Sequence, residues 1–504
     1  MEGYDVTVQS DFVLLRILGN DLPPRHESGQ TVRNLRFILE HEPQLTGCSK
    51  VWILNRIVCP RVEAELIGLL ERHGRRYNRI PFDADAYRRV GWSFEHMSKT
   101  GYLEGPAWDA LSELEKQRIN EKTYEFKNLY VMNNNGARNH ALNLGRSLAR
   151  WVLPFDGNCF FTASAWDQLR EHVLAQPDLP YFIVPMARII DNAALLEPDF
   201  VVPATHEPQV LFRSDARETF DERFRYGTRP KVELLMRLGV PGVWDYWKID
   251  SWELKQPDPS LDAGRFAQAG WVARLFSGHP EQERVTAEAM LLRGRARRSG
   301  ILSMIDSLDE RLLREDWEAG LQPSTPEGGE GSGRREEGSE PWEHRDDQTR
   351  AQKAIDDIDS STLASTLMGA VRGAERAVTL LQTRFVDARA PTGPRWDTAP
   401  ADTERLQRFA LAVHTLRRAR TLSERDEATF REWLHHRTAW PTEGNLAQPA
   451  QTVTCDSGMA LDLWHLTVAA YLGDARCVIN LLKANDFRLY RSTGRDSGPP
   501  ANAR

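Results

Sequence analysis

The sequence predicts an α/β domain with a mainly parallel sheet, followed by a linker and an all-α domain. The chain has 504 residues, more than a single domain usually contains. Over its first part, short apolar runs alternate with helical patterns, which is typical of a parallel sheet with helices on its faces. We expect domains at residues 1–318 and 350–490, a linker at 319–349 and a disordered tail at 491–504.

Six short apolar runs predict buried strands. They are VLLRIL (13–18), KVWILNRI (50–57), NLYVMNN (128–134), WVLPFD (151–156), YFIVPMARI (181–189) and PQVLFR (208–213). Apolar residues at helical spacing in TVRNLRFILEHEP and EAELIGLLERHG predict helices between the first three runs. In such sheets ligands bind outside the carboxyl ends of the strands.

The segment LQPSTPEGGEGSGRREEGSE (321–340) marks the predicted linker. It is rich in Gly, Pro, Ser and charged residues and almost free of apolar ones. Such a segment cannot bury enough surface to offset its ordering entropy. Beyond it, apolar residues recur every three to four positions, which predicts helices.

Charge, the N-terminal segment and the cysteine pattern exclude several classes of protein. The net charge is −7, so the chain has no large basic excess for phosphate neutralisation, and no nucleic acid partner is expected. No signal peptide and no membrane span is predicted, because no apolar run is long enough. The five cysteines are scattered without a CxxC pair, and we expect a cytoplasmic location.

The most informative stretch is NNNGARNHALNLGRSLARWVLPFDGN (133–158). Gly136 permits a turn after the predicted strand, and a helix with one apolar face follows. Arg138 lies at its start, and a helix N-terminus with an arginine suits a diphosphate or another anion. The next strand brings Asp156 to the same sheet edge, where Asp156 and Asn158 offer oxygen ligands for one hard cation.

This arrangement resembles the GT-A fold of nucleotide-sugar-dependent glycosyltransferases, many of which carry GxARN before the strand that ends in Asp-x-Asp. Here the segment is NGARN (135–139), and Asp156-Gly157-Asn158 occupies the motif position with an amide for the second carboxylate. The resemblance covers roughly residues 11–300 and implies a Rossmann-type, mainly parallel sheet. It implies nucleotide-sugar binding by Asn20, Asp21, Asn135, Arg138, Asn139, Asp156 and Asn158.

A second segment, RYGTRPKVELLMRLGVPGVWD (225–245), resembles the GT-A segment that supplies the base for the acceptor hydroxyl. The resemblance implies Glu233 as this catalytic base, with Asp221 as a close competitor. Glu207 begins a strand that is expected on the acceptor side. The implied reaction transfers a sugar from a nucleotide-diphosphate donor to a carbohydrate or other hydroxyl acceptor, with inversion at the anomeric carbon.

A metal site is also implied by the resemblance. A divalent cation, Mn²⁺ or Mg²⁺, would be held by Asp156 and Asn158, together with His279, which lies where several GT-A enzymes have a late histidine ligand. The cation and Arg138 would neutralise the leaving diphosphate.

The segment CDSGMALDLWHLTVAAYLGDARCVINLL (455–482) resembles part of the alginate lyase superfamily, whose members form (α/α) barrels. Gly458, Asp462-Leu463, Val468-Ala469-Ala470 and Leu472-Gly473-Asp474 match the family pattern. The catalytic Asn-Asn-His is absent, so we expect a truncated domain that binds or scaffolds. Two alternatives to a glycosyltransferase remain, namely a non-catalytic nucleotide-sugar or carbohydrate-binding protein and a polysaccharide lyase.

Overall fold

The computed structural model describes residues 10–94, 96, 106–197, 200, 202–242, 253–284, 286–321, 428, 466, 469–470 and 472–493. The chain forms two compact units, one of residues Met1–Leu308 with Thr493–Arg504 and one of Asp309–Ser492. Of the predicted linker and helical domain, the described residues belong mainly to α11 (Ala287–Leu321) and α17 (Ala475–Thr493). The remainder, including most of the lyase-like segment, lies outside the described residues.

A mixed sheet forms the centre of the first unit. Among the described residues its strand order is β3-β2-β1-β4-β7-β6-β9-β5, with β8 beside β6. The strands are β1 (Ser10–Leu18), β2 (Cys48–Asn55), β3 (Arg76–Ile80), β4 (Ala149–Asp156), β5 (Cys159–Phe160), β6 (Tyr181–Arg188), β7 (His206–Arg213), β8 (Phe266–Gln268) and β9 (Val272–Arg274). The first four strands are mutually parallel, whereas β7 is antiparallel to β4 and β6. The predicted α/β class with a mostly parallel sheet is confirmed.

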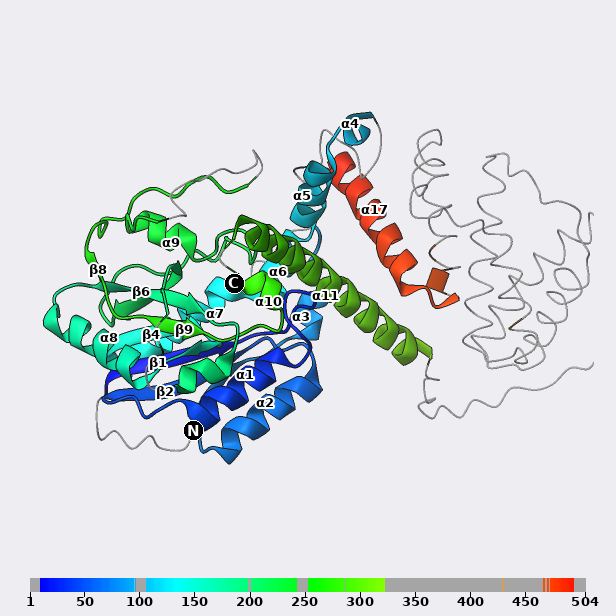
Figure 1. Ribbon diagram of the computed structural model, residues 1–504. Helices are drawn as coiled ribbons and strands as arrows, with labels where there is room; N and C mark the ends of the chain where they lie inside the picture. The colour runs from blue at the N-terminus through cyan, green and yellow to red at the C-terminus, as the bar shows by residue number, and fades with distance from the viewer. Residues whose placement is uncertain are drawn as a thin grey trace, which may run out of the picture. The chain divides into compact units, whose positions relative to one another are not determined.

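Helices pack on both faces of this sheet. The remaining described helices of the first unit are α1 (Gln30–His41), α2 (Pro60–Arg72), α3 (Ala84–Arg88), α4 (Pro106–Asp109), α5 (Glu113–Thr123), α6 (Glu125–Met132), α7 (Asn134–Arg146), α8 (Ala163–Ala175), α9 (Val232–Arg237), α10 (Pro280–Glu283) and the 3₁₀ helix η2 (Asn192–Leu196). Figure 1 shows α1 and α2, in blue, side by side next to β1 and β2, whose side chains share one apolar cluster with them. In the described part of the chain, no helix has the length and apolar character needed to cross a membrane.

Strand β1 shows why the sheet is covered on both sides. Phe12 and Leu14 are buried against residues of α8, while Val13 and Leu15 are buried against residues of α7 and α9. Successive side chains of a strand point to opposite faces, so a continuous apolar run is stable only between two layers of helices. The run VLLRIL therefore predicts a central strand.

One of the six predicted strands is wrong. Residues 128–134 belong to α6 and to the start of α7, and Asn133 joins the two helices with a left-handed backbone (φ 41°). The run is short and mostly buried, and such runs have no period that separates a strand from a helix. The strand β3, with the largely polar sequence RYNRI, is not among the six predicted ones and lies at the sheet edge.

The carboxyl ends of β1 and β4 lie side by side. Ile17 is the register partner of Asp156 in the parallel ladder between them. From β1 the chain continues to β2 and β3 on one side and later returns to β4 on the other side. Loops diverge where the strand order reverses in this way, and they leave a crevice at the carboxyl ends of the strands.

Gly157 follows β4 where the backbone of β1 approaches closely. A Cβ atom here would lie 2.5 Å from the carbonyl oxygen of Ile17 and 2.9 Å from Leu18 Cδ2. We expect Gly157→Ala to lower the free energy of unfolding by about 1–3 kcal/mol, measured by urea denaturation. Gly19→Ala is the control, because a Cβ atom there would meet nothing within 4 Å. Equal losses in the two variants would contradict the steric explanation.

Candidate functional site

A cavity of ≈ 320 Å³ opens at the carboxyl ends of β1 and β4. The end of β1 and the residues after it, from Leu18 to Leu22, line one side, and Asp156, Gly157 and Asn158 line another. Asn134 and Arg138 from the first turns of α7 also contribute to its wall. Its volume falls within the range of small-molecule sites, and it lies where the strand order reverses.

Asp156 is an ionised carboxylate between two cationic side chains. It accepts hydrogen bonds from Arg138 Nη2 and Gln209 Nε2, both at 2.9 Å, and Lys231 Nζ lies 3.8 Å from its Oδ2. Arg138 and Lys231 are only 4% and 2% exposed. Burial would raise the pKa of Asp156, but the charges of Lys231, Arg138 and Arg274 hold it well below its usual value. The proximity of Arg138 and Asp156 that the sequence predicts is confirmed.

The groups around Asp156 do not fit the divalent cation that the sequence predicts. Both of its carboxylate oxygens already accept hydrogen bonds, and the charges of Arg138 and Lys231 would repel a metal ion at this position. Asn158 lines the cavity but adds only a neutral ligand. His279 is the N-cap residue of α10 and is not among the residues that line the cavity. Within the described ranges, no three His, Cys, Asp or Glu side chains are grouped so that they could hold a metal ion.

Cationic side chains outnumber carboxylates along the cavity. Its described lining contains six arginine or lysine side chains and three carboxylates, namely Arg138, Arg188, Arg229, Lys231, Arg274 and Arg297 against Asp21, Asp156 and Glu207. The chain as a whole has a net charge of −7. The cavity is therefore a locally positive region of an acidic protein, and it is suited to bind anions.

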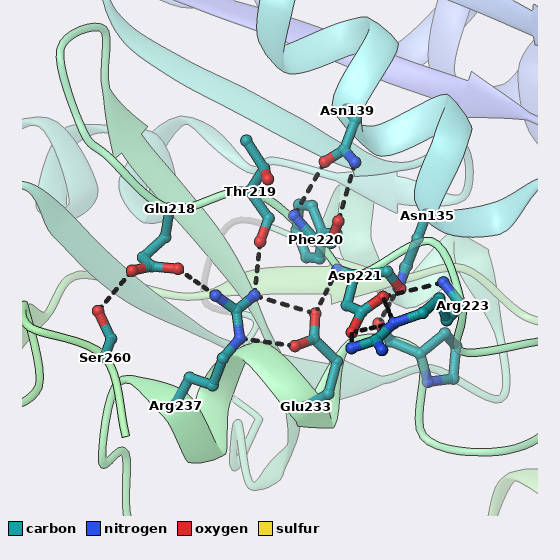
Figure 2. A network of polar contacts seen from close by, with 11 residues as sticks. Asn135, Asn139, Glu218, Thr219, Phe220, Asp221, Arg223, Glu233, Arg237 and Ser260 are labelled. Atoms are coloured by element: carbon teal, nitrogen blue, oxygen red, sulfur yellow. Dashed lines mark hydrogen bonds and ion pairs between the residues drawn. The ribbon is translucent and has the colours of Figure 1, made fainter. Parts of the chain in front are cut away.

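The asparagines of the NGARN segment have a structural role, which Figure 2 shows. Asn139 accepts a hydrogen bond from the Phe220 amide and donates one to the Phe220 carbonyl, both at 2.9 Å. Asn135 Nδ2 donates to the carbonyl oxygen of Asp221 at 2.7 Å. Neither asparagine lines the cavity. Their side-chain amides bind residues 220–221, in the segment before Lys231, to α7. Their position does not support the predicted role in nucleotide-sugar binding.

The two predicted catalytic carboxylates also lie outside the cavity lining. Glu233 is fully buried, and it accepts hydrogen bonds from Arg237 Nε and from the Asp221 amide, both at 2.8 Å (Figure 2). Burial raises the pKa of Glu233, although Arg237 opposes this effect. The carboxylate of Asp221 is paired with Arg223 at 2.6 Å. Glu233 thus connects α9 to the loop before it, and Asp221 binds an arginine of the same loop. The positions of these two carboxylates do not support a role as general base.

Asn20 and Asp21 line the cavity, but they also hold its walls together. Asn20 donates to the Arg56 carbonyl at 2.8 Å and accepts from the Val58 amide at 3.0 Å, so both ends of its side-chain amide bind the loop after β2. Asp21 Oδ1 accepts hydrogen bonds from the amide and the hydroxyl of Thr31 in the first turn of α1. A nucleotide-binding role for either residue remains a prediction.

Several lining residues could not be found by sequence reasoning. Lys231, Arg274 and Arg297 come from the loop before α9, from β9 and from α11. No fixed spacing relates them, and the sequence signal for Lys231 is only its place in the segment 225–245. Glu207 lies at the start of β7, the strand that was expected on the acceptor side. Its carboxylate lies 3.3 Å from Lys231 Nζ.

No protein-family model matches the chain, and no curated protein matches it in sequence. The functional interpretation therefore depends on the geometry and charge of the cavity.

Proposed function

We propose that the chain is a glycosyltransferase that moves a sugar from a nucleotide-diphosphate donor to a hydroxyl acceptor, with a GT-A-like domain. The supporting observation is the positively charged cavity between the ends of β1 and β4. Doubly wound α/β sheets bind nucleotides at such a reversal of strand order. Guanidinium groups match phosphate oxygens in geometry and charge, so the diphosphate is assigned to this cavity.

The reaction requires a base for the acceptor and a stabilised leaving group. The acceptor oxygen attacks the anomeric carbon, the bond from this carbon to the diphosphate oxygen breaks, and the electron pair leaves with the diphosphate. Arg138, Arg274 and Arg297 line the cavity where they can stabilise the developing negative charge. The acceptor proton goes to a carboxylate, and attack opposite the leaving group inverts the anomeric carbon.

We assign the base to Glu207 in place of Glu233, because Glu207 lines the cavity. Partial burial would raise the pKa of Glu207, whose side chain is 48% exposed, but Lys231 and Arg297 lower it below its usual value. The carboxylate is therefore ionised at neutral pH and can accept a proton. A bound diphosphate would neutralise these two cations and make Glu207 a stronger base.

Replacing Glu207 by glutamine tests this assignment. We expect kcat for nucleotide release from the best nucleotide sugar to fall about 10²- to 10⁴-fold, with little change in the dissociation constant of the nucleoside diphosphate. The exposed Glu197 lies outside the cavity lining, and Glu197→Gln is the control. Unchanged kcat in a folded Glu207→Gln protein would contradict the assignment.

A non-catalytic nucleotide-sugar-binding protein is the second candidate. The ion pair of Glu207 with Lys231, at 3.3 Å, favours it because the pairing weakens the proposed base. A panel of nucleotide sugars, assayed for nucleotide release with and without hydroxyl acceptors, separates the two. Binding of nucleoside diphosphates without turnover of any donor would favour the second candidate.

A further inference from the structure

We propose that the cavity binds the diphosphate of its donor without a divalent cation, and that Arg274 and Arg297 take the place of the metal ion. This inference rests on the proposed function, since it concerns how the same cavity holds its donor. It differs from the sequence-based expectation, in which Asp156 and Asn158 hold Mn²⁺ or Mg²⁺.

Arg274 is a charged side chain that donates no hydrogen bond to a described residue. It lies on β9, lines the cavity, and makes no side-chain hydrogen bond or ion pair with any described residue, and its Nε is buried without a partner. Burial would lower the pKa of Arg274, but Glu283 and Asp156 raise it above its usual value. The Arg274 side chain is only partly buried, but its Nε is a buried donor without a hydrogen-bond partner among the described residues. Such a donor is costly, and phosphate oxygens from a ligand would satisfy it.

Arg297 is the second cation of this kind. It reaches the cavity from α11, and its guanidinium lies 5.6 Å from the centre of the Tyr226 ring. Its Nε is also buried without a partner, and no ion pair joins it to a described carboxylate. Stacking on an aromatic ring orients a guanidinium without using its N–H donors. Two guanidinium groups, one from β9 and one from α11, thus line one cavity without a hydrogen bond to any described residue.

The other charged groups explain why these two arginines are available. Arg138 and Lys231 are engaged by Asp156, and Arg188 is bound to Glu283 at 2.6 Å. The negative charge of Asp156 therefore neutralises Arg138 and Lys231, and this carboxylate is not free to bind a metal ion. Asn158 makes no side-chain hydrogen bond to a described residue, so its amide can donate to a phosphate or a sugar hydroxyl.

Isothermal titration tests the inference with inorganic pyrophosphate, UDP, GDP and ADP, in EDTA and again in MnCl₂. We expect at least one nucleoside diphosphate, and pyrophosphate, to bind in EDTA with an affinity within about threefold of that in MnCl₂. Arg274→Gln and Arg297→Gln should each weaken binding about 10- to 100-fold. Neither substitution removes a hydrogen bond or an ion pair within the described part of the chain, so both proteins should fold, which circular dichroism checks.

Two further variants make the test specific. Arg295→Gln is the matched control, because Arg295 is exposed on the same helix and does not line the cavity. It should bind pyrophosphate like the wild type. Arg274→Lys keeps the charge and should recover part of the affinity that Arg274→Gln loses.

The outcomes separate this inference from the proposed function. Binding of nucleoside diphosphates only in MnCl₂ would overturn the inference that Arg274 and Arg297 bind the diphosphate without a metal ion. It would not contradict the glycosyltransferase proposal. Absence of binding in both buffers would overturn both. Binding of pyrophosphate in EDTA, combined with no turnover of any nucleotide sugar, would support diphosphate binding by Arg274 and Arg297 and contradict the proposal of a glycosyltransferase.

Discussion

Replacing Asp156 by alanine is expected to lower the free energy of unfolding by about 3–5 kcal/mol. The side chains of Arg138 and Lys231 are 5% and 2% exposed, and Asp156 lies within 2.9 Å and 3.8 Å of them. Without this carboxylate, Arg138 would have no ion-pair partner among the described residues, and Lys231 would keep Glu207 at 3.3 Å as its one described partner. Urea denaturation at neutral pH measures the loss.

Asp215→Ala provides the control for this variant. Asp215 also pairs with an arginine, Arg213, but its side chain is 67% exposed, so its removal should cost about 1 kcal/mol or less.

The response of Asp156→Ala to pyrophosphate is a second test of the role of Asp156. If Asp156 serves as a counter-ion, pyrophosphate should stabilise Asp156→Ala at least as much as the wild type, because the anion replaces the missing charge. Loss of all pyrophosphate binding in a folded Asp156→Ala protein would favour a metal-ligand role.

Glu283→Gln is expected to cause the second large loss, about 3 kcal/mol or more at neutral pH. Glu283 accepts hydrogen bonds from Arg25 Nη1 at 3.0 Å and Arg188 Nη1 at 2.6 Å, and all three side chains are at most 9% exposed. Arg188 lines the cavity. The substitution would leave the buried guanidinium groups of Arg25 and Arg188 without an ion-pair partner among the described residues. Glu281→Gln on the same short helix is the control, because the Glu281 side chain is 56% exposed.

The pH dependence of this loss follows from the pKa of Glu283. Burial would raise that pKa, but Arg274, Arg25 and Arg188 lower it from 4.5 to about 2. A carboxyl group with a lowered pKa in the folded state stabilises the protein above its unfolded pKa, and this stabilisation is lost as the pH falls toward the folded pKa. The difference in unfolding free energy between wild type and Glu283→Gln should therefore shrink between pH 4.5 and 2. A constant difference over this range would contradict the assigned ion pairs.

The fold was predictable where burial leaves a clear pattern. The runs 13–18 and 151–156 are buried on both faces of the sheet, and each proved to be a strand; the two strands pair with each other in parallel. The run 128–134 also has an apolar centre, LYVM, but it is helical, because so short an apolar run does not distinguish a buried helix from a buried strand. The edge strand β3 has few buried side chains, so its sequence lacks an apolar signal.

The site was predictable only where its residues are close in sequence. Arg138 lies in the first turns of α7 and Asp156 at the end of β4, the next element along the chain, so their proximity was predicted from the sequence. The role of Asn139 depends on Phe220, which is distant in sequence, and no spacing rule connects them. Arg274 and Arg297 likewise join the cavity only through tertiary packing. The charge surplus of the cavity is a property of the folded chain.

A crystal structure of the chain soaked with the nucleoside diphosphate that binds most tightly tests the central claim most directly. We predict density for the ligand in the cavity between the ends of β1 and β4, with phosphate oxygens within about 3.2 Å of Arg274 and Arg297. Density for the diphosphate at another place on the protein, or an empty cavity at saturating ligand, would contradict the claim.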